Sequence, residues 1–426
     1  MTAPGGSSRA SVARHATWLA AGRVASQVLA VVLTVVLARG LGTVGFGQYA
    51  FVGAIIVIAN MITTFGTDSL LIREFAGGRV DPGRLLTSAL ALQLVLSLVC
   101  IVFIAGGAGW LPGRSADTVT ALRIYALALL PLAFYSVFSA ALRGWERMDL
   151  YAQLTIGTAG LQTVAAVAAV LVRARLSDVV VALLLAQVGA ALLGWWLCRV
   201  ARPAFTVGHW SARIALGVLI GDVWPLALLS GLAVVTQRIG VVLLSFLAGD
   251  APAGWFSAAA RVVEGLKLAH YAVQGGMLPV ASRLAAREAF EDTFIARTAF
   301  AEMVRGSLAI LVAISAVAAV AATLVAGPIV TLLYGRAYGP AIDALRLLAW
   351  TLIPTAVAGP LSLAFVSEGR ERIALRIAVL ALAVTIGLGL WLIPRAGLQG
   401  ACVAVLIGET VRTVSLVVAT RRVTRS

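Results

Sequence analysis

The chain has 426 residues, 61% of them hydrophobic and only 12% charged, and its mean hydropathy is +1.00. This balance excludes an ordinary soluble protein and indicates that most of the chain lies in a membrane. A net charge of +15 would suit a nucleic-acid-binding protein, but the basic residues concentrate in every second loop. That distribution is a membrane-topology signal, so no nucleic-acid partner is expected.

Apolar segments long enough to cross a bilayer recur from one end of the chain to the other. A membrane-spanning helix needs about 20 mostly apolar residues. The segments lack the period-2 alternation of barrel strands, so they predict an all-α polytopic membrane protein. The twelve predicted spans are residues 16–38, 47–66, 85–106, 119–142, 151–172, 178–198, 217–247, 255–280, 299–325, 341–367, 373–393 and 397–420.

Sequence patterns recur about half the chain apart. The pattern Leu-Arg-x-x-Ala-x-x-Leu-x-Pro occurs at residues 122–131 and again at residues 345–354, an offset of 223 residues. Internal repeats of this kind are typical of transporters, which move one repeat against the other. The glycines that recur, at an offset of 207 residues, are Gly42 with Gly249 and Gly47 with Gly254.

The loops predict the orientation of the spans. Eighteen arginines lie in the terminal segments and even-numbered loops, against six in the odd-numbered loops. Because cytoplasmic loops are enriched in Lys and Arg, both termini are predicted to lie inside the cell. Six spans per repeat then give two parallel six-helix lobes, residues 1–205 with spans one to six and residues 206–426 with spans seven to twelve.

Polar side chains within the predicted spans are the candidates for a substrate site, because they are costly in hydrocarbon and usually face a cavity. Uncharged ones often serve only as hydrogen-bond partners between helices, and for the amides that interpretation stays open. The candidates in spans one, two and seven are Arg23, Gln27, Asn60 and Arg238.

The eighth span carries the strongest such pattern: Arg261, Glu264, Lys267, Tyr271 and Gln274 follow one another at spacings that place them on one helical face. Lys267 is the only lysine among 33 basic residues. A lysine near the bilayer centre costs roughly 2.5–3.5 kcal/mol. Two interpretations stay open. Glu264 neutralises Arg261 and Lys267 within a packed bundle, or the face lines a wet cationic pathway.

Basic groups outnumber acidic groups within the spans, which favours an anionic ligand and in particular a phosphate held by guanidinium donors. We expect Arg23, Arg261 and Lys267 to converge on one solvent-accessible cavity between the lobes, with Arg238 close by. Glu264 and Glu409 are the candidates for carrying a coupling ion or proton. Glu409 lies three residues before Arg412 in the twelfth span, a spacing at which the two pair.

The sequence gives little support for catalysis, metal binding or a disulfide. The three cysteines, Cys100, Cys198 and Cys402, all lie within apolar spans, so neither a disulfide nor a metal motif is expected. A phosphate-binding loop with the Gly-Lys-Ser/Thr ending is missing, and the predicted outer loops are short. We therefore expect no cofactor, no metal and no catalytic residue, and interpret the chain as a transporter and not an enzyme.

Four segments resemble bacterial polysaccharide-biosynthesis membrane proteins, the O-antigen-type flippases of the multidrug/oligosaccharidyl-lipid/polysaccharide exporter superfamily. They are LARGLGTVGFGQYA at residues 37–50, GDAPAGWFSAAAR at 249–261, YGRAY at 334–338 and IPRAGLQGA at 393–401. The resemblance implies a bacterial inner-membrane flippase with a central cationic cavity and alternating access. Its substrate would be an undecaprenyl-pyrophosphate-linked oligosaccharide, and its partners would include membrane lipid and the polymerase or glycosyltransferase machinery.

Relatives in this superfamily refine the expectation. The lipid II flippase uses arginines in its first and eighth spans, where Arg23 and Arg261 stand here. It usually has two further C-terminal helices, which favours an oligosaccharide unit as the substrate here. A cation-coupled multidrug antiporter is the first alternative, but that branch usually needs acidic residues within the spans of the first lobe, where this chain has only Asp68 near an inner edge and Asp117 and Asp178 near outer edges. A membrane scaffold for glycan enzymes is the second.

Overall fold

The computed structural model describes residues 7–64, 66–77, 82–202, 224–267, 293–367 and 369–423, and these residues are almost entirely helical, with no strand among them. The all-α prediction is therefore confirmed. The chain divides into two compact units, residues 1–254 and 255–426. The predicted lobe boundary at residues 205 and 206 falls outside the described residues and stays a prediction.

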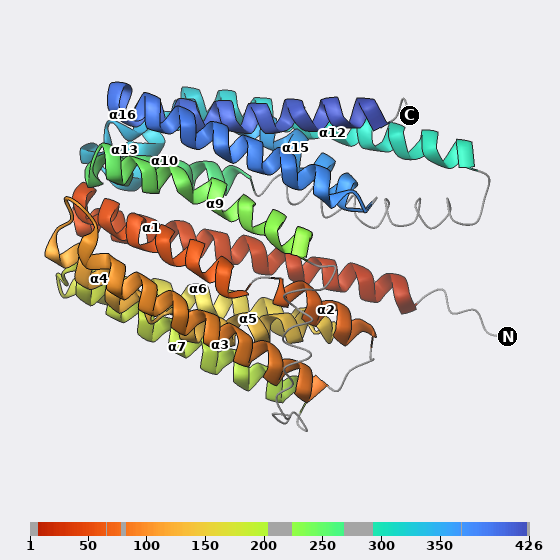
Figure 1. Ribbon diagram of the computed structural model, residues 1–426, viewed down its shortest axis with the longest axis horizontal. Coiled ribbons are helices and arrows are strands. Elements are labelled where there is room, and N and C mark those ends of the chain that lie inside the picture. The colour runs from red at the N-terminus through yellow and green to blue at the C-terminus, as the bar shows by residue number, and fades with distance from the viewer. Residues whose placement is uncertain are drawn as a thin grey trace. The chain divides into compact units, whose positions relative to one another are not determined.

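The first unit is a bundle of long helices packed side by side (Figure 1). Its long first helix bends at Gly42, which has a φ of 69°. The elements are α1 (Ser7–Thr64), α2 (Thr67–Gly77), α3 (Pro82–Gly107), η1 (Ala108–Trp110), α4 (Ala116–Ala126), α5 (Leu129–Gly144), α6 (Met148–Leu171), α7 (Leu176–Ala201) and α9 (Trp224–Leu247).

The second unit is also helical, and its last helix bends at Gly397, which has a φ of 52°. Helix α10 begins in the first unit and continues into the second. The elements are α10 (Asp250–Leu266), α12 (Thr293–Leu324), α13 (Ala326–Tyr334), η2 (Arg336–Tyr338), α14 (Ala341–Ala349), α15 (Leu352–Ser367) and α16 (Glu371–Val423).

Among the described residues, seven helices are long and apolar enough to cross a membrane, and two bent pairs, α12 with α13 and α14 with α15, raise the number to nine. Two of the seven, α1 and α16, each cover two predicted spans joined at a kinked glycine. The predicted eighth span continues past Lys267, beyond the described residues. The polytopic fold is thus confirmed, while the count of twelve and the orientation stay predictions.

The duplicated sequence pattern produces the same local structure in both units. Helix α4 ends at Ala126 and α5 begins at Leu129; α14 ends at Ala349 and α15 begins at Leu352, each 223 residues later. The proline that closes each copy lacks an N–H group and so removes one helical hydrogen bond at the break. Short i to i−3 bonds replace it at equivalent positions, 3.0 Å from Ala128 N to Tyr125 O and 3.0 Å from Thr351 N to Leu348 O.

Small residues bring the helices of the first unit together. A Cβ added to Gly194 of α7 would lie 3.2 Å from the side chain of Phe138 on α5 and 3.5 Å from that of Leu154 on α6. Both neighbours are buried in a core that includes Leu142. Because lipid supplies no hydrophobic driving force between helices, such close packing carries much of their association.

Gly194→Val should therefore destabilise the first unit by about 1–3 kcal/mol, the usual cost of overpacking a tight core. Thermal unfolding of the purified protein in detergent measures this effect. The matched control is Gly160→Val on α6, where an added Cβ meets nothing within 4 Å. Equal melting temperatures for the two variants would contradict the packing argument.

Candidate functional site

The predicted site residues fall in both units. Arg23, Gln27, Asn60 and Arg238 lie in the first unit, and Arg261, Glu264, Lys267 and Glu409 in the second. Tyr271 and Gln274 lie outside the described residues. The predicted convergence of Arg23, Arg261 and Lys267 on one cavity stays a prediction.

Two amides of α1 have buried polar atoms without a hydrogen-bond partner among the described residues: Nε2 of Gln27 and Oδ1 of Asn60. Arg23, one turn before Gln27, is exposed. Unsatisfied buried groups cost about 1–3 kcal/mol each, so these amides are suited to binding water or the hydroxyls of a ligand. By contrast, Thr63 and Thr64 donate to the Asn60 carbonyl, at 2.9 and 3.0 Å, and are satisfied within their own helix.

Arg238 lies half-buried on α9, a helix that packs against α1 within the first unit. The same unit therefore carries two of the predicted arginines and the two amides on a pair of contacting helices. Guanidinium groups are suited to phosphate and amides to hydroxyls, so both kinds of group are present there.

The acidic residue of the first unit near the predicted inner edge has a structural partner. Asp68 accepts hydrogen bonds from Ser136 Oγ at 2.6 Å and from Arg143 Nη2 at 3.1 Å. The buried Gln93 amide donates to Ser136 and Thr67 and extends this network. Because Arg143 compensates its charge, Asp68 serves to hold helices together, which weakens the case for a cation antiporter built on it.

In the second unit, Arg261 and Glu264 pair on α10, with 2.8 Å between Nη1 and Oε2 and each side chain 25% exposed. Lys267 lies half-buried one turn beyond. The pair with Arg261 is part of the first interpretation, in which Glu264 neutralises Arg261 and Lys267, and the choice between the two interpretations stays open. A guanidinium has five N–H donors, so this carboxylate leaves others for a second anion.

Tyr334 at the end of α13 is a group that the sequence analysis missed. Its side chain is only 3% exposed, and its hydroxyl lacks a hydrogen-bond partner in the described part of the chain. It lies within electrostatic range of Arg261 and Glu264. Trp255 Nε1 donates to the Ala337 carbonyl at 3.3 Å and ties α10 to η2 beside it. Tyr334 belongs to the YGRAY segment noted in the sequence analysis. Its proximity to α10 could not be predicted, because the two are far apart along the chain.

Glu409 in α16 pairs with Arg412 at 3.5 Å, as predicted. Glu409 Oε2 is buried, and it makes no hydrogen bond with the residues that the structure describes. The neighbouring Thr413 hydroxyl instead donates to the carbonyls of Pro354 and Glu409. The coupling role expected of Glu409 stays a prediction.

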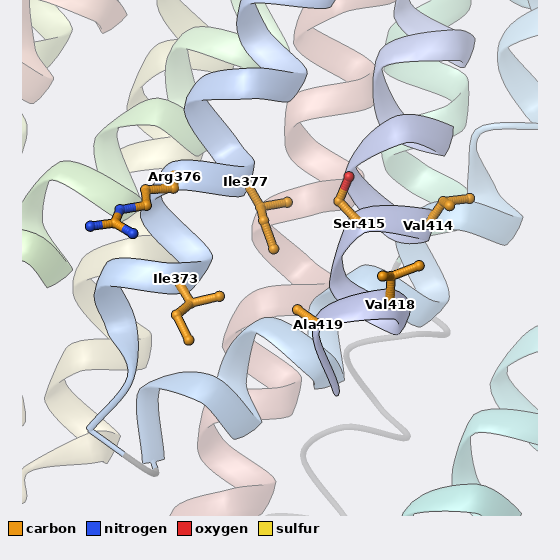
Figure 2. Close-up of a pocket in the computed structure, with 7 residues that line it drawn as sticks. All are labelled: Ile373, Arg376, Ile377, Val414, Ser415, Val418 and Ala419. Carbon is orange, nitrogen blue, oxygen red and sulfur yellow. The ribbon is translucent and has the colours of Figure 1, made fainter. Parts of the chain in front are cut away.

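A groove of about 410 Å³ opens between the two arms of α16 (Figure 2). Ile373 and Ile377 line one side and Val414 and Val418 the other, whereas Arg376 extends away from the opposite arm. The groove is apolar, and the residues that line it include none of the predicted site residues. It is therefore not the candidate substrate site.

Two family models match the sequence. A model described as "Polysaccharide biosynthesis protein" matches residues 12–285, which is more than half of the chain. A model described as "Lipid II flippase MurJ" matches residues 216–425. Among curated protein sequences, none matches the chain.

Solved structures show the fold. An inward-facing multidrug resistance MATE family transporter of the MOP superfamily aligns with a TM-score of 0.75 at 19% identity, over 94% of this chain and 95% of that one. An outward-facing MATE transporter aligns with a TM-score of 0.68 at 18% identity, over 97% of this chain and 96% of that one. A MOP superfamily transporter from Pyrococcus furiosus, whose binding pocket is described as having reverse polarity, gives 0.67 at 18%, over 97% and 95%. The chain has the two-lobe helical fold of these transporters.

Tyr334→Phe should leave the protein folded and raise its thermal stability slightly, by roughly 1 kcal/mol, because the substitution removes an unsatisfied buried hydroxyl. If that hydroxyl binds substrate, transport should fall several-fold at equal protein abundance. Melting temperature and transport are measured on the same preparations. A drop in melting temperature would show that the hydroxyl has a structural partner.

Proposed function

Because the chain belongs to the polysaccharide biosynthesis protein family, we propose that it is a flippase for an undecaprenyl-pyrophosphate-linked oligosaccharide. It is a multi-pass protein of the bacterial inner membrane, and its families are transporters and flippases, not enzymes. The observation that carries the proposal is the cationic excess on the membrane helices: Arg23, Arg238, Arg261 and Lys267 against Glu264 and Glu409.

The substrate explains why such costly residues are present. A pyrophosphate cannot cross hydrocarbon unpaired, because burying its charges without partners costs far more than binding them. The guanidinium groups of Arg23 and Arg261 each donate two parallel hydrogen bonds to phosphate oxygens, and Lys267 adds a point charge. The unsatisfied amides of Gln27 and Asn60 bind sugar hydroxyls, while the prenyl chain stays in lipid. Movement of one lobe against the other then exposes the headgroup to the opposite side.

Glu264 has a defined part in this proposal. Its 2.8 Å contact with Arg261 lowers the cost of keeping that cation in the membrane before substrate binds. An incoming pyrophosphate competes for the same guanidinium and takes over the role of counter-ion. Glu264 and Glu409 are the two carboxylates on which a coupling proton or ion would act.

A lipid-linked peptidoglycan precursor is the second candidate substrate, favoured by the match of residues 216–425 to the lipid II flippase model. It shares the polyprenyl pyrophosphate, so the cationic residues would act in the same way. Complementation of two deletion strains, one lacking the oligosaccharide flippase and one lacking the lipid II flippase, separates the two substrates. A cation-coupled drug antiporter stays the alternative of another class, and drug sensitivity of the same strains tests it.

Arg261→Ala should abolish translocation at unchanged abundance, and Arg261→Lys should restore it only in part, since a point charge replaces a planar fork of donors. The assay is accumulation of lipid-linked oligosaccharide on the inner leaflet of a deletion strain carrying each variant. The matched control is Arg395→Ala on α16, where the exposed guanidinium donates to the Trp391 carbonyl of its own helix. Full complementation by Arg261→Ala would return this arginine to a structural role.

Glu264→Gln separates two roles of that carboxylate. If Glu264 only neutralises Arg261, the variant has a more cationic site, and transport should persist with tighter binding of substrate. If Glu264 carries the coupling proton, transport should stop while substrate still binds. Binding of the lipid-linked oligosaccharide to purified protein, measured beside translocation in cells, distinguishes these outcomes. Loss of both binding and transport would contradict both roles.

A further inference from the structure

The duplicated glycine corners of the sequence meet in the first unit. Gly42 and Gly249, with φ values of 69° and 94°, each turn the chain at the end of a helix. Five residues later, a Cβ added to Gly47 would lie 1.7 Å from the carbonyl oxygen of Asp250. Conversely, a Cβ on Gly254 would lie 2.4 Å from the carbonyl oxygen of Thr43. The two corners therefore pack backbone against backbone, and only glycine permits this approach.

A buried ion pair fastens this contact. Arg114, in the segment between η1 and α4, donates from Nη1 to Asp250 Oδ1 at 2.6 Å and to Ser245 Oγ at 2.7 Å. Ser245 Oγ lies 2.8 Å from the same carboxylate oxygen. The side chain of Arg114 is only 4% exposed and that of Asp250 17%. Burial lowers the pKa of Arg114, and the neighbouring Asp250 acts in the opposite direction.

Two aromatic rings enclose the guanidinium. Its Cζ lies 4.1 Å from the ring centroid of Phe51 on α1 and 4.7 Å from that of Phe246 on α9. The rings themselves meet edge to face at 5.3 Å. Arg114 Nε and Nη2 are buried and make no hydrogen bond in the part of the chain that the structure describes. Asp250 is thus the charged partner of this arginine, and the arginine joins α1, α9 and the first turn of α10.

We propose that Arg114 and Asp250 form a latch that closes the predicted outer side at the bend of α1 and the end of α9, and that this latch breaks when that side opens during transport. The inference rests on the proposed function. It follows from where the latch lies: α1 and α9 belong to different sequence repeats, and repeats move against each other in transporters of this kind. Asp250 also begins the helix that carries Arg261 and Glu264, so releasing the latch frees the helix of the candidate site.

The two sequence repeats differ at the residues that form the latch. Thr43 stands at the repeat position of Asp250, so the first corner has no carboxylate. Gly335 and Arg336 stand at the positions of Gly113 and Arg114, an offset of 222 residues, and both glycines have a positive φ. Arg336 is exposed, whereas Arg114 is buried. An arginine–carboxylate pair therefore forms at the corner that contains Asp250, whereas the corner that contains Thr43 has no carboxylate.

Hydrogen–deuterium exchange on the purified full-length protein tests the latch. Arg114→Gln and Asp250→Asn should each speed amide exchange in segments 43–54 and 244–253 by about tenfold or more, because breaking a buried pair leaves one charge uncompensated. The double variant should exchange no faster than the single ones, since both remove one interaction. Segment 139–150, which contains Arg143 of the Asp68 network, should be unchanged. Arg114→Lys, which keeps the charge, should give an intermediate rate.

The matched control is Arg346→Gln, which breaks an exposed arginine–aspartate pair of 3.2 Å and should alter exchange in none of these segments. Unchanged exchange at the two corners, or a uniform rise across the chain with a lower melting temperature, would overturn the latch. Because the measurement uses no substrate, it is independent of whether the oligosaccharide is the transported molecule. If the corner exchange rises but translocation at equal abundance stays at the wild-type rate, the gating role is overturned.

Discussion

The cost of placing charge in a low-dielectric environment governs this structure. Each charged group that the sequence puts within or beside a membrane helix has to find a counter-ion, a ring face or water. Arg261 pairs with Glu264, Glu409 with Arg412, and Asp68 with Arg143. Pairs of this kind contribute little net stability, because desolvation offsets most of the attraction. They make buried charge tolerable, and so leave it available for a ligand.

The balance of charge on the described membrane helices bears on the proposed substrate. Basic groups outnumber acidic groups among the candidate residues, and Gln27 and Asn60 in the first unit have buried amide atoms without a hydrogen-bond partner among the described residues. Under the proposed function, a pyrophosphate joined to sugars would use both kinds of group, whereas an organic cation would be repelled by the basic ones.

Much of the fold could be predicted from the sequence because hydropathy and repetition are local or periodic signals. The apolar segments on either side of Gly42 and Gly397 gave the spans, and the duplicated proline pattern coincides with a helix break in both units. Neighbours along one helix, such as Arg261 with Glu264, follow from spacing alone. Contacts between distant segments do not: neither Tyr334 beside α10 nor Arg114 against Asp250 has a sequence signature, since both depend on how helices pack. The expected convergence of Arg23 and Lys267 is also a contact between distant segments, so spacing along the chain cannot predict it.

The reciprocal packing of the glycine corners has a consequence for the origin of the protein. Gly47 of the first repeat packs against Asp250 of the second, and Gly254 of the second repeat packs against Thr43 of the first. Since Thr43 and Asp250 are equivalent positions of the repeats, this is the arrangement of a two-fold symmetric homodimer interface. A single-repeat ancestor with this corner would have bound a second copy of itself through the same backbone surface. Within one chain the two corners need not stay identical. Asp250 has a carboxylate and Thr43 does not, so Arg114 pairs with one side of an otherwise reciprocal contact.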